Sequence, residues 1–259
     1  MTKIVVAVKH VPDATADRRF SADHTVDRAS VDGLLSELDE YAVEQALQIV
    51  EAADGEVTVI TVGPEPAVDA VRKALQMGAD SGIHVCDDAI HGSDALATSA
   101  VLAAAIGAID CDLVLFGMAS TDSGLGVVPT LVAERLGLPA VTYASEITVD
   151  GDTVRISRDG DVETQQIEAS GKLLVSVTDQ TGEARYPSFK GIMSAKKKDV
   201  QRWTLADVGL DAAAVGLDNA WTKVESAVPR PPRATGTIVT DQGDGGAQLA
   251  AFLAAMKFI

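Results

Sequence analysis

Aromatic residues and cysteines are scarce in this chain. Of its 259 residues only 4% are Phe, Trp or Tyr, and the two cysteines, Cys86 and Cys111, stand in separate segments outside any CxxC pattern. The four histidines are scattered as well, so we expect two buried thiols and no metal site. A low aromatic share combined with 47% apolar residues favours closely packed α/β layers over an aromatic-rich sandwich.

Positive charge is also in short supply. Lys and Arg number 21 against 38 Asp and Glu, which gives a formal net charge of −17. Because nucleic acids and anionic membranes are bound through cations that neutralise phosphates, the sequence argues against both kinds of partner. The simplest explanation of the charge is solubility in a salty or crowded cytosol. One run opposes the trend, Lys196-Lys197-Lys198.

Long apolar runs are missing. No stretch reaches the roughly 18 residues that a membrane-spanning helix needs. The strand pattern of residues 3–9 stands at the start of the sequence, and we expect neither a signal peptide nor a transit segment. We therefore expect a cytoplasmic protein without membrane insertion.

Strand-like and helix-like patterns alternate over the first 140 residues. Strands are predicted at 4–8, 56–62, 83–85 and 112–117, and helices at 36–53, 66–77, 93–109 and 128–136. This alternation predicts a parallel sheet with helices on both faces and right-handed crossovers. Ligands of such sheets bind beyond the carboxyl ends of the strands. Ser36 is predicted to cap the first helix, with Asp39 in the acidic position of a capping box.

The pattern changes after residue 140. Short strands at 146–149, 153–157, 162–167 and 173–177 are separated by turns that include two Asp-Gly pairs, and we expect them to extend the sheet in antiparallel fashion. From residue 182 onward the chain is predicted to be peripheral. It contains a short basic helix at 192–198, a helical turn at 204–207, a proline-rich linker at 228–233 and a terminal amphipathic helix at 247–258.

The segment with the clearest chemical meaning is residues 117–129, here called the glycine loop. Gly117, Gly124 and Gly126 permit close backbone approach and positive φ, and Ser120 and Ser123 add hydroxyls. The helix that follows presents unpaired N–H groups and the positive end of its dipole. The loop therefore predicts a phosphate cradle without any lysine. The alternative is a glycine-rich turn that holds nothing.

Residues near other strand ends complete this prediction. Ala7, Val62 and the start of the first helix could contact an adenine and its ribose, or could merely pack there. Asp122 could hold a ribose or magnesium, or could bond the backbone of its own loop. No serine or cysteine nucleophile stands in a recognisable elbow, so we expect no catalytic residues and no enzymatic activity of the chain by itself.

Several ordered motifs resemble the β subunit of electron-transfer flavoproteins, the small-subunit family that includes the nitrogen-fixation-associated A protein. The most specific is an Arg-Tyr pair at 185–186, a short spacer, and Ile-Met-Ser-Ala-Lys-Lys-Lys at 192–198. Further motifs lie at 6–13, 40–46, 74–80, the glycine loop and 161–164.

The resemblance implies an adenine-nucleotide α-hydrolase-like α/β fold in a heterodimer with an α subunit. It implies FAD held mainly by the α subunit and AMP bound by this chain. By position the cofactor site would comprise Ala7, Ser36, Glu37, Leu38, Asp39, Val62, Gly117, Ser120, Asp122, Ser123, Gly124, Leu125, Gly126, Val127 and Val128.

Two positions depart from the family pattern. Leu38 stands where other members place an aromatic residue against the flavin ring. Gly126, Val127 and Val128 replace polar residues, so phosphate binding would rest on backbone N–H groups. A subset of the family bifurcates electrons and binds a second FAD in place of AMP.

The resemblance also implies a loop that docks onto acyl-CoA or other dehydrogenases, with electrons passed on to a quinone oxidoreductase. Phe189 would insert into the partner. The lysine run would steer acidic partners, or would instead favour a helix dipole. The recognition residues would be Arg185, Tyr186, Phe189, Lys196, Lys197 and Lys198.

The expected domains are a nucleotide-binding domain with its antiparallel extension at 1–182, a recognition loop with the basic helix at 183–203, and an arm contacting the α subunit at 204–259. A stand-alone nucleotide sensor of the universal-stress type is the main alternative. It leaves the hairpin strands and the C-terminal arm unexplained. An ATP-consuming enzyme would need a catalytic lysine or metal-binding acids beside the loop, where only Asp122 is seen.

Overall fold

The computed structural model describes residues 2–228 and 230–259. Pro229 of the expected linker lies outside the described residues. The chain divides into two units, Met1–Glu225 and Ser226–Ile259.

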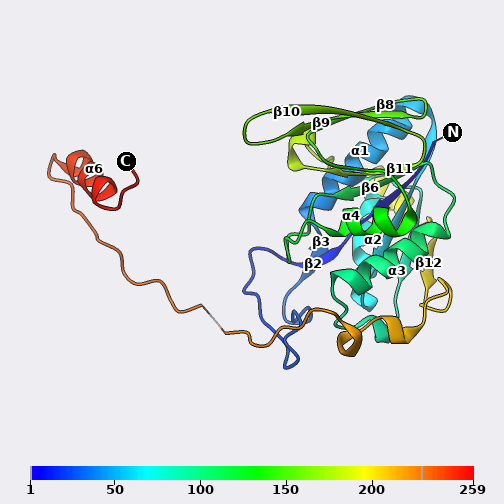
Figure 1. The fold of residues 1–259 in the computed structure, drawn as a ribbon, viewed down its shortest axis with the longest axis horizontal. Coiled ribbons are helices and arrows are strands. Elements are labelled where there is room, and N and C mark those ends of the chain that lie inside the picture. Colours follow the sequence, from blue (N-terminus) through cyan, green and yellow to red (C-terminus); the bar gives the residue numbers. More distant parts are fainter. Residues whose placement is uncertain (1, 229) are drawn as a thin grey trace. The chain divides into compact units, whose positions relative to one another are not determined.

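A seven-stranded sheet forms the centre of the first unit (Figure 1). Its strands lie in the order β12-β5-β4-β1-β6-β11-β7, and every pairing is parallel. The strands are β1 (Thr2–Ala7), β4 (Gly55–Val62), β5 (Ser81–Val85), β6 (Leu113–Gly117), β7 (Ala140–Ala144), β11 (Leu173–Val177) and β12 (Val200–Trp203). This confirms the predicted α/β fold with a parallel sheet.

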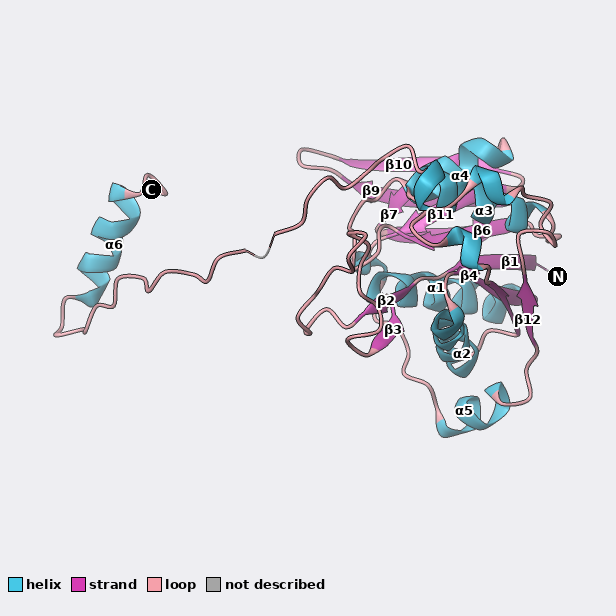
Figure 2. Ribbon diagram, turned by 90° about the horizontal axis from the view of Figure 1, so that it is seen from below, coloured by secondary structure: helices cyan, strands magenta, loops and turns pink. Residues whose placement is uncertain are grey.

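Helices cover both faces of the sheet (Figure 2). Helices α1 (Glu37–Ala53) and α2 (Val68–Met77) lie on one face, and α3 (Ala95–Gly107) and α4 (Val128–Leu136) lie on the other. The short helix α5 (Phe189–Ala195) packs on α2. Because side chains alternate along a strand, Val6 of β1 packs with α1 and α2, whereas Val5 packs in a second core with α3 and α4. Cys86 and Cys111 are both buried and unpaired, as expected.

The predicted antiparallel hairpins are present and form a sheet of their own. Strands β8 (Glu146–Asp150), β9 (Thr153–Asp159) and β10 (Thr164–Ser170) pair in sequence order. The Ser145 amide connects this sheet to the end of β7 by donating to the carbonyl of Ser157 at 2.8 Å. The hairpins therefore lie beside the parallel sheet and do not continue its hydrogen-bond ladder.

Strands β7, β2 (His10–Pro12) and β3 (Gly33–Leu35) were not predicted, and β11 and β12 differ from the expectation. The segment predicted as a hairpin strand at 173–177 is β11, a buried parallel strand between β6 and β7. Its continuous apolar pattern fits a strand covered on both faces. Strand β12 adds a parallel edge strand from a region expected to be peripheral. Its mixed polar sequence, VQRW, carries no strong strand signal.

The two short strands β2 and β3 pair antiparallel at the base of the loop 13–32. In the second unit, α6 (Gly245–Ala255) confirms the predicted terminal helix. Among the described residues no helix combines the length and apolar character needed to cross a membrane.

Candidate functional site

The glycine loop begins where β6 meets the start of α1. A Cβ on Gly117 would lie 2.5 Å from the Asp39 carboxylate and 2.6 Å from the carbonyl of Leu38, so only glycine allows this close approach. Further along, Gly124 and Gly126 adopt left-handed conformations with φ of 61° and 70°. Glycine is therefore required at all three positions, by close packing at Gly117 and by positive φ at Gly124 and Gly126.

The loop presents backbone donors that the protein itself leaves unused. The Gly124 amide donates to the carbonyl of Ser120 at 2.9 Å. In the described ranges, 2–228 and 230–259, the amides of Leu125, Gly126 and Val127 donate to no other group. The first amide of this region to bond within α4 is that of Leu131, to the carbonyl of Val127 at 3.0 Å. The loop thus leads into a helix N-terminus that favours an anion.

Cationic side chains also gather at this loop. Lys9 Nζ lies 2.7 Å and Arg28 Nη2 lies 3.0 Å from the Asp122 carboxylate, whose side chain is only 2% exposed. Arg18 donates to the carbonyls of Thr121 at 2.6 Å and Asp122 at 3.0 Å. Burial opposes ionisation of Asp122, but the Lys9 ammonium, helped by Arg28, holds its pKa well below the usual value.

Lys9, Arg18 and Arg28 are the residues that the sequence analysis missed. The predicted cradle used donors of the loop alone, and the structure places a lysine from outside the loop beside it. Lys9 Nζ also lies 3.3 Å from the hydroxyl of Ser120 and 3.5 Å from that of Ser123. The signal that could have found Lys9 is its place just past the carboxyl end of β1. Arg18 and Arg28 come from the irregular loop 13–32, which carries no periodic pattern.

The start of α1 is attached to the loop in a way that differs from the predicted capping box. Ser36 precedes the helix, but its side chain makes no capping bond. Its hydroxyl accepts a hydrogen bond from the Thr121 amide at 3.3 Å. The Asp39 carboxylate accepts one from the Lys9 amide at 2.8 Å. Both side chains serve tertiary contacts, which replace the local capping role.

Burial raises the pKa of Asp39 to about 7, although the hydrogen bond from the Lys9 amide and the Lys9 charge act in the opposite direction. Asp39 and Asp122 therefore lie close to one loop with pKa values shifted in opposite directions.

The sheet brings the remaining predicted site residues to one edge. Ala7 pairs in register with Ile60 of β4 and Phe116 of β6, so the ends of these three strands are neighbours. Ala7 is buried, Val62 and Leu38 are half-buried, and Glu37 is exposed. Leu125 and Val127 are exposed at 55% and 43%, which leaves the loop accessible to a ligand.

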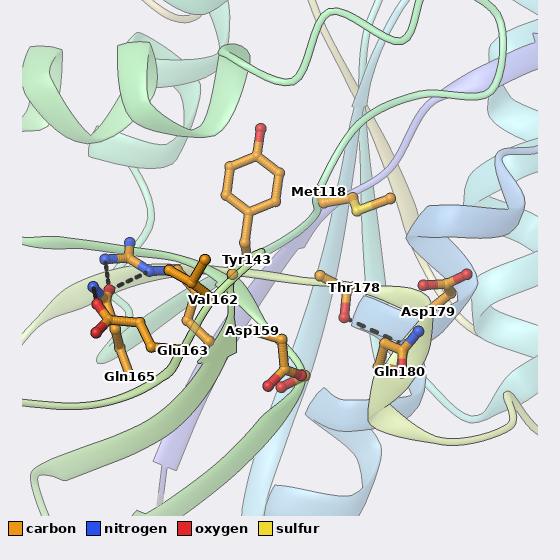
Figure 3. A pocket seen from close by; sticks show the side chains of 12 residues that line it. Met118, Tyr143, Asp159, Val162, Glu163, Gln165, Thr178, Asp179 and Gln180 are labelled. Atoms are coloured by element: carbon orange, nitrogen blue, oxygen red, sulfur yellow. Dashed lines mark hydrogen bonds between the residues drawn. The ribbon is translucent and has the colours of Figure 1, made fainter. Parts of the chain in front are cut away.

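A cavity of about 760 Å³ opens beside the glycine loop (Figure 3). Met118 and Thr178 lie on one side of it and the β9–β10 hairpin on the other. None of the predicted cofactor residues lines it. Tyr143 belongs to its wall and reaches the loop, because its hydroxyl donates to the Gly126 carbonyl at 3.1 Å.

The predicted recognition residues divide into exposed and anchored side chains. Tyr186 and Phe189 are 92% and 81% exposed, and Lys196 and Lys197 are exposed as well. Arg185 instead bonds Glu44 and Glu51 of α1. Lys198 donates to carbonyls at the end of α2, including that of Gly78 at 2.9 Å.

The fold and the loop together define an α/β protein in which loop amides and cationic side chains gather at the carboxyl ends of parallel strands. A family model described as the electron transfer flavoprotein domain matches residues 23–208. The electron transfer flavoprotein subunit beta of Mycobacterium leprae is 46% identical over 266 residues, covering 100% of both chains.

That of Megasphaera elsdenii is 33% identical, with 93% of each chain covered. Subunit CarD of the caffeyl-CoA reductase-Etf complex of Acetobacterium woodii is 33% identical, with 92% of each covered. The chain belongs to the electron transfer flavoprotein family and is of the β-subunit type, which confirms the resemblance seen in the sequence. It is thereby a flavoprotein component of electron transport.

Proposed function

We propose that the chain is the β subunit of a heterodimeric electron-transfer flavoprotein that binds AMP as a structural nucleotide. It works in the cytoplasm as an electron carrier without catalytic residues of its own. Its α subunit holds most of the FAD. The complex accepts electrons from acyl-CoA or other dehydrogenases and passes them to a quinone oxidoreductase. The match to β subunits over the full length favours this role over a stand-alone nucleotide sensor.

One observation carries the nucleotide proposal: the unused amides of residues 125–127 at the start of α4. Lys9, Arg18 and Arg28 give three positive charges at the loop, against the carboxylate of Asp122 and the carboxyl group of Asp39, whose pKa is raised to about 7. A site of net positive charge in a chain of formal charge −17 suits the doubly charged phosphate of AMP. The glycines leave room for the phosphate, and the residues present therefore fit the nucleotide.

We assign the segments after residue 182 the roles that the corresponding segments have in the family. Residues 183–203 present the docking loop for the dehydrogenase, and residues 204–259 form the arm that contacts the α subunit. The bound AMP joins the ends of β1, β4 and β6 to the glycine loop and stiffens this edge of the sheet. FAD in place of AMP is the second candidate, because the same amides would donate to its pyrophosphate.

Substitution of Gly124 tests the site directly. Valine at this position would have to adopt φ of 61° and would project into the open space that the phosphate requires. We expect the Gly124→Val complex, purified with its α subunit, to release at least about tenfold less AMP after acid denaturation than the wild type, while the FAD of the α subunit is released in the same amount. Mass spectrometry of the released molecule distinguishes AMP from a second FAD.

Gly151→Val is the matched control. Gly151 has φ of 63°, and a Cβ placed on it would meet no atom within 4 Å, as for Gly124, but it lies in the β8–β9 turn. Its nucleotide content should equal that of the wild type. Unchanged content in Gly124→Val, or a wild-type complex without adenine nucleotide in this chain, would contradict the proposal.

A further inference from the structure

Tyr143 occupies an irregular position in β7. Val141 pairs with Val175 and Ala144 pairs with Val177, so two residues of β7 oppose the single Ser176 of β11. This extra residue is a β-bulge, a device that redirects a side chain out of the strand alternation. Tyr143 has φ of 61°, a left-handed conformation that is strained for a bulky residue.

The neighbouring strand supports the bulge. The Tyr143 amide donates to the hydroxyl of Ser176 at 3.0 Å, and Ser176 is 1% exposed. This buried hydroxyl replaces the ladder bond that the bulge removes, so the amide is not left unpaired. Figure 3 shows the ring of Tyr143 projecting away from the hairpin residues Val162 and Glu163.

The redirected side chain ends at the glycine loop. The Tyr143 hydroxyl donates to the carbonyl of Gly126 at 3.1 Å. A Cβ on Gly126 would lie 2.7 Å from the phenol oxygen, so glycine at this position leaves room for the contact. The strained tyrosine and the left-handed glycine therefore fit each other.

This contact fixes the direction of one amide. A trans peptide is planar, so the carbonyl of Gly126 and the N–H of Val127 point in opposite directions. With the carbonyl held by Tyr143, the Val127 N–H faces away from Tyr143. In the part of the chain that the structure describes, this N–H has no intramolecular partner.

We propose that Tyr143 is a positioning residue, which holds the Gly126–Val127 peptide so that the Val127 N–H can donate to the nucleotide phosphate. The inference rests on the proposed nucleotide site and adds a residue from outside the loop. The bulge, the buried Ser176 hydroxyl and the missing Cβ of Gly126 all serve one contact. Tyr143 itself does not touch the phosphate and acts through the peptide.

Tyr143→Phe tests this role, because it keeps the ring and removes the hydroxyl. The full-length chain in complex with its α subunit is stripped of nucleotide, and AMP binding is measured by calorimetry. We expect the Kd for AMP to rise roughly fivefold, as for loss of one hydrogen bond. Before AMP is added, amide exchange of Gly124 and Leu131, whose N–H groups donate hydrogen bonds on either side of the Gly126–Val127 peptide, should also become faster, whereas exchange of the core strands should not change.

Tyr41→Phe is the control, since no hydrogen bond of the Tyr41 hydroxyl is found in residues 2–228 and 230–259, and it should leave both measurements unchanged. If the wild type binds AMP and Tyr143→Phe binds it equally well, the positioning role is refuted while the nucleotide site stands. Faster exchange throughout the sheet would also refute it, because the hydroxyl would then be a general stabiliser. A wild-type complex that binds no AMP would overturn the proposed function and, with it, this inference.

Discussion

Asp39 and Asp122 show how one loop can shift two carboxyl groups in opposite directions. Asp122 lies against the ammonium of Lys9 and the guanidinium of Arg28, and these charges outweigh the effect of its burial. Asp39 is also buried, but no cationic side chain forms an ion pair with it among the described residues, and the Lys9 amide is its hydrogen-bond donor. Its pKa of about 7 follows from burial, which the hydrogen bond from the Lys9 amide and the Lys9 charge offset only in part.

The raised pKa of Asp39 predicts a pH-dependent stability. The folded chain binds this proton more tightly than the unfolded chain, whose carboxyl has a pKa of 3.8. Proton binding by Asp39 therefore adds its full contribution to the free energy of unfolding below pH 3.8, the pKa in the unfolded chain. This contribution is lost as the pH rises to about 7, the pKa in the folded chain. In Asp39→Asn, we expect the free energy of unfolding, relative to the wild type, to increase over this window and to level off above it.

Urea denaturation at a series of pH values measures this difference. We expect the difference in the free energy of unfolding to reach the order of 1–3 kcal/mol. Asparagine can still accept the hydrogen bond from the Lys9 amide, so the variant keeps this contact. Asp161→Asn in the exposed β9–β10 turn is the control and should show no such trend. A difference that stays constant from about pH 4 to 8 would mean that Asp39 does not titrate in this range.

At the scale of single elements, the segment predicted to recognise partners, residues 183–203, is anchored near both ends and exposed between them. Arg185 bonds Glu44 and Glu51 of α1, and Lys198 bonds carbonyls at the end of α2. A Cβ on Gly191 would lie 2.4 Å from the carbonyl of Gln76, so α5 approaches α2 closely. Phe189 is therefore held on an anchored segment, and if it docks onto a dehydrogenase, as we propose, this anchoring would lower the entropy lost on docking.

Phe189→Ala should slow electron exchange with dehydrogenases without changing the flavin content of the complex. The side chain is 81% exposed, so its removal costs the fold little, whereas an apolar anchor contributes strongly to a docked interface. We expect a decrease of about tenfold in the second-order rate constant, measured by stopped-flow absorbance. Val162→Ala, which truncates another exposed apolar residue, is the control. Equal rates in Phe189→Ala and the wild type would remove Phe189 from the docking role.

The elements that the sequence predicted are those with strong local signals. Buried apolar strands followed by Gly or Pro, and helices of regular apolar period, were found to within a few residues. Strand β12 was missed because its four residues, VQRW, have no strong strand propensity pattern, and they form a strand by pairing with β5. The arrangement of β11 between β6 and β7 was not predicted, because a short apolar run does not reveal its neighbours.

In the candidate site too, the parts with a local sequence signal were predicted, and the parts that depend on tertiary contacts were not. The glycine loop was found because its residues are contiguous. The contacts of Lys9 with Asp122 and of Tyr143 with Gly126 join residues far apart in the sequence, and no local pattern indicates them. The hydroxyl of Ser36, predicted as a cap, bonds Thr121 because a tertiary partner competes with the helix terminus.

At the scale of the whole molecule, the second unit differs from the first in having little of its surface buried. Leu249, Phe252 and Met256 of the α6 region are 59%, 50% and 55% exposed. Apolar side chains that recur at helical spacing and stay accessible indicate a surface for a partner. Because the chain is of the β-subunit type, we propose that the α subunit covers this surface.

Removal of residues 226–259 should therefore weaken the heterodimer without unfolding the first unit, which contains the complete sheet and the glycine loop. We expect the truncated chain to keep its thermal midpoint and to bind the α subunit at least about tenfold more weakly in sedimentation experiments. The full-length triple variant Leu249→Ser, Phe252→Ser and Met256→Ser separates the apolar face of α6 from the length of the arm. The triple variant keeps the residues that connect α6 to the first unit. If it weakens association as much as the deletion does, the apolar face of α6 makes the contact with the α subunit. A truncated chain that associates like the wild type would show that the first unit alone binds the α subunit.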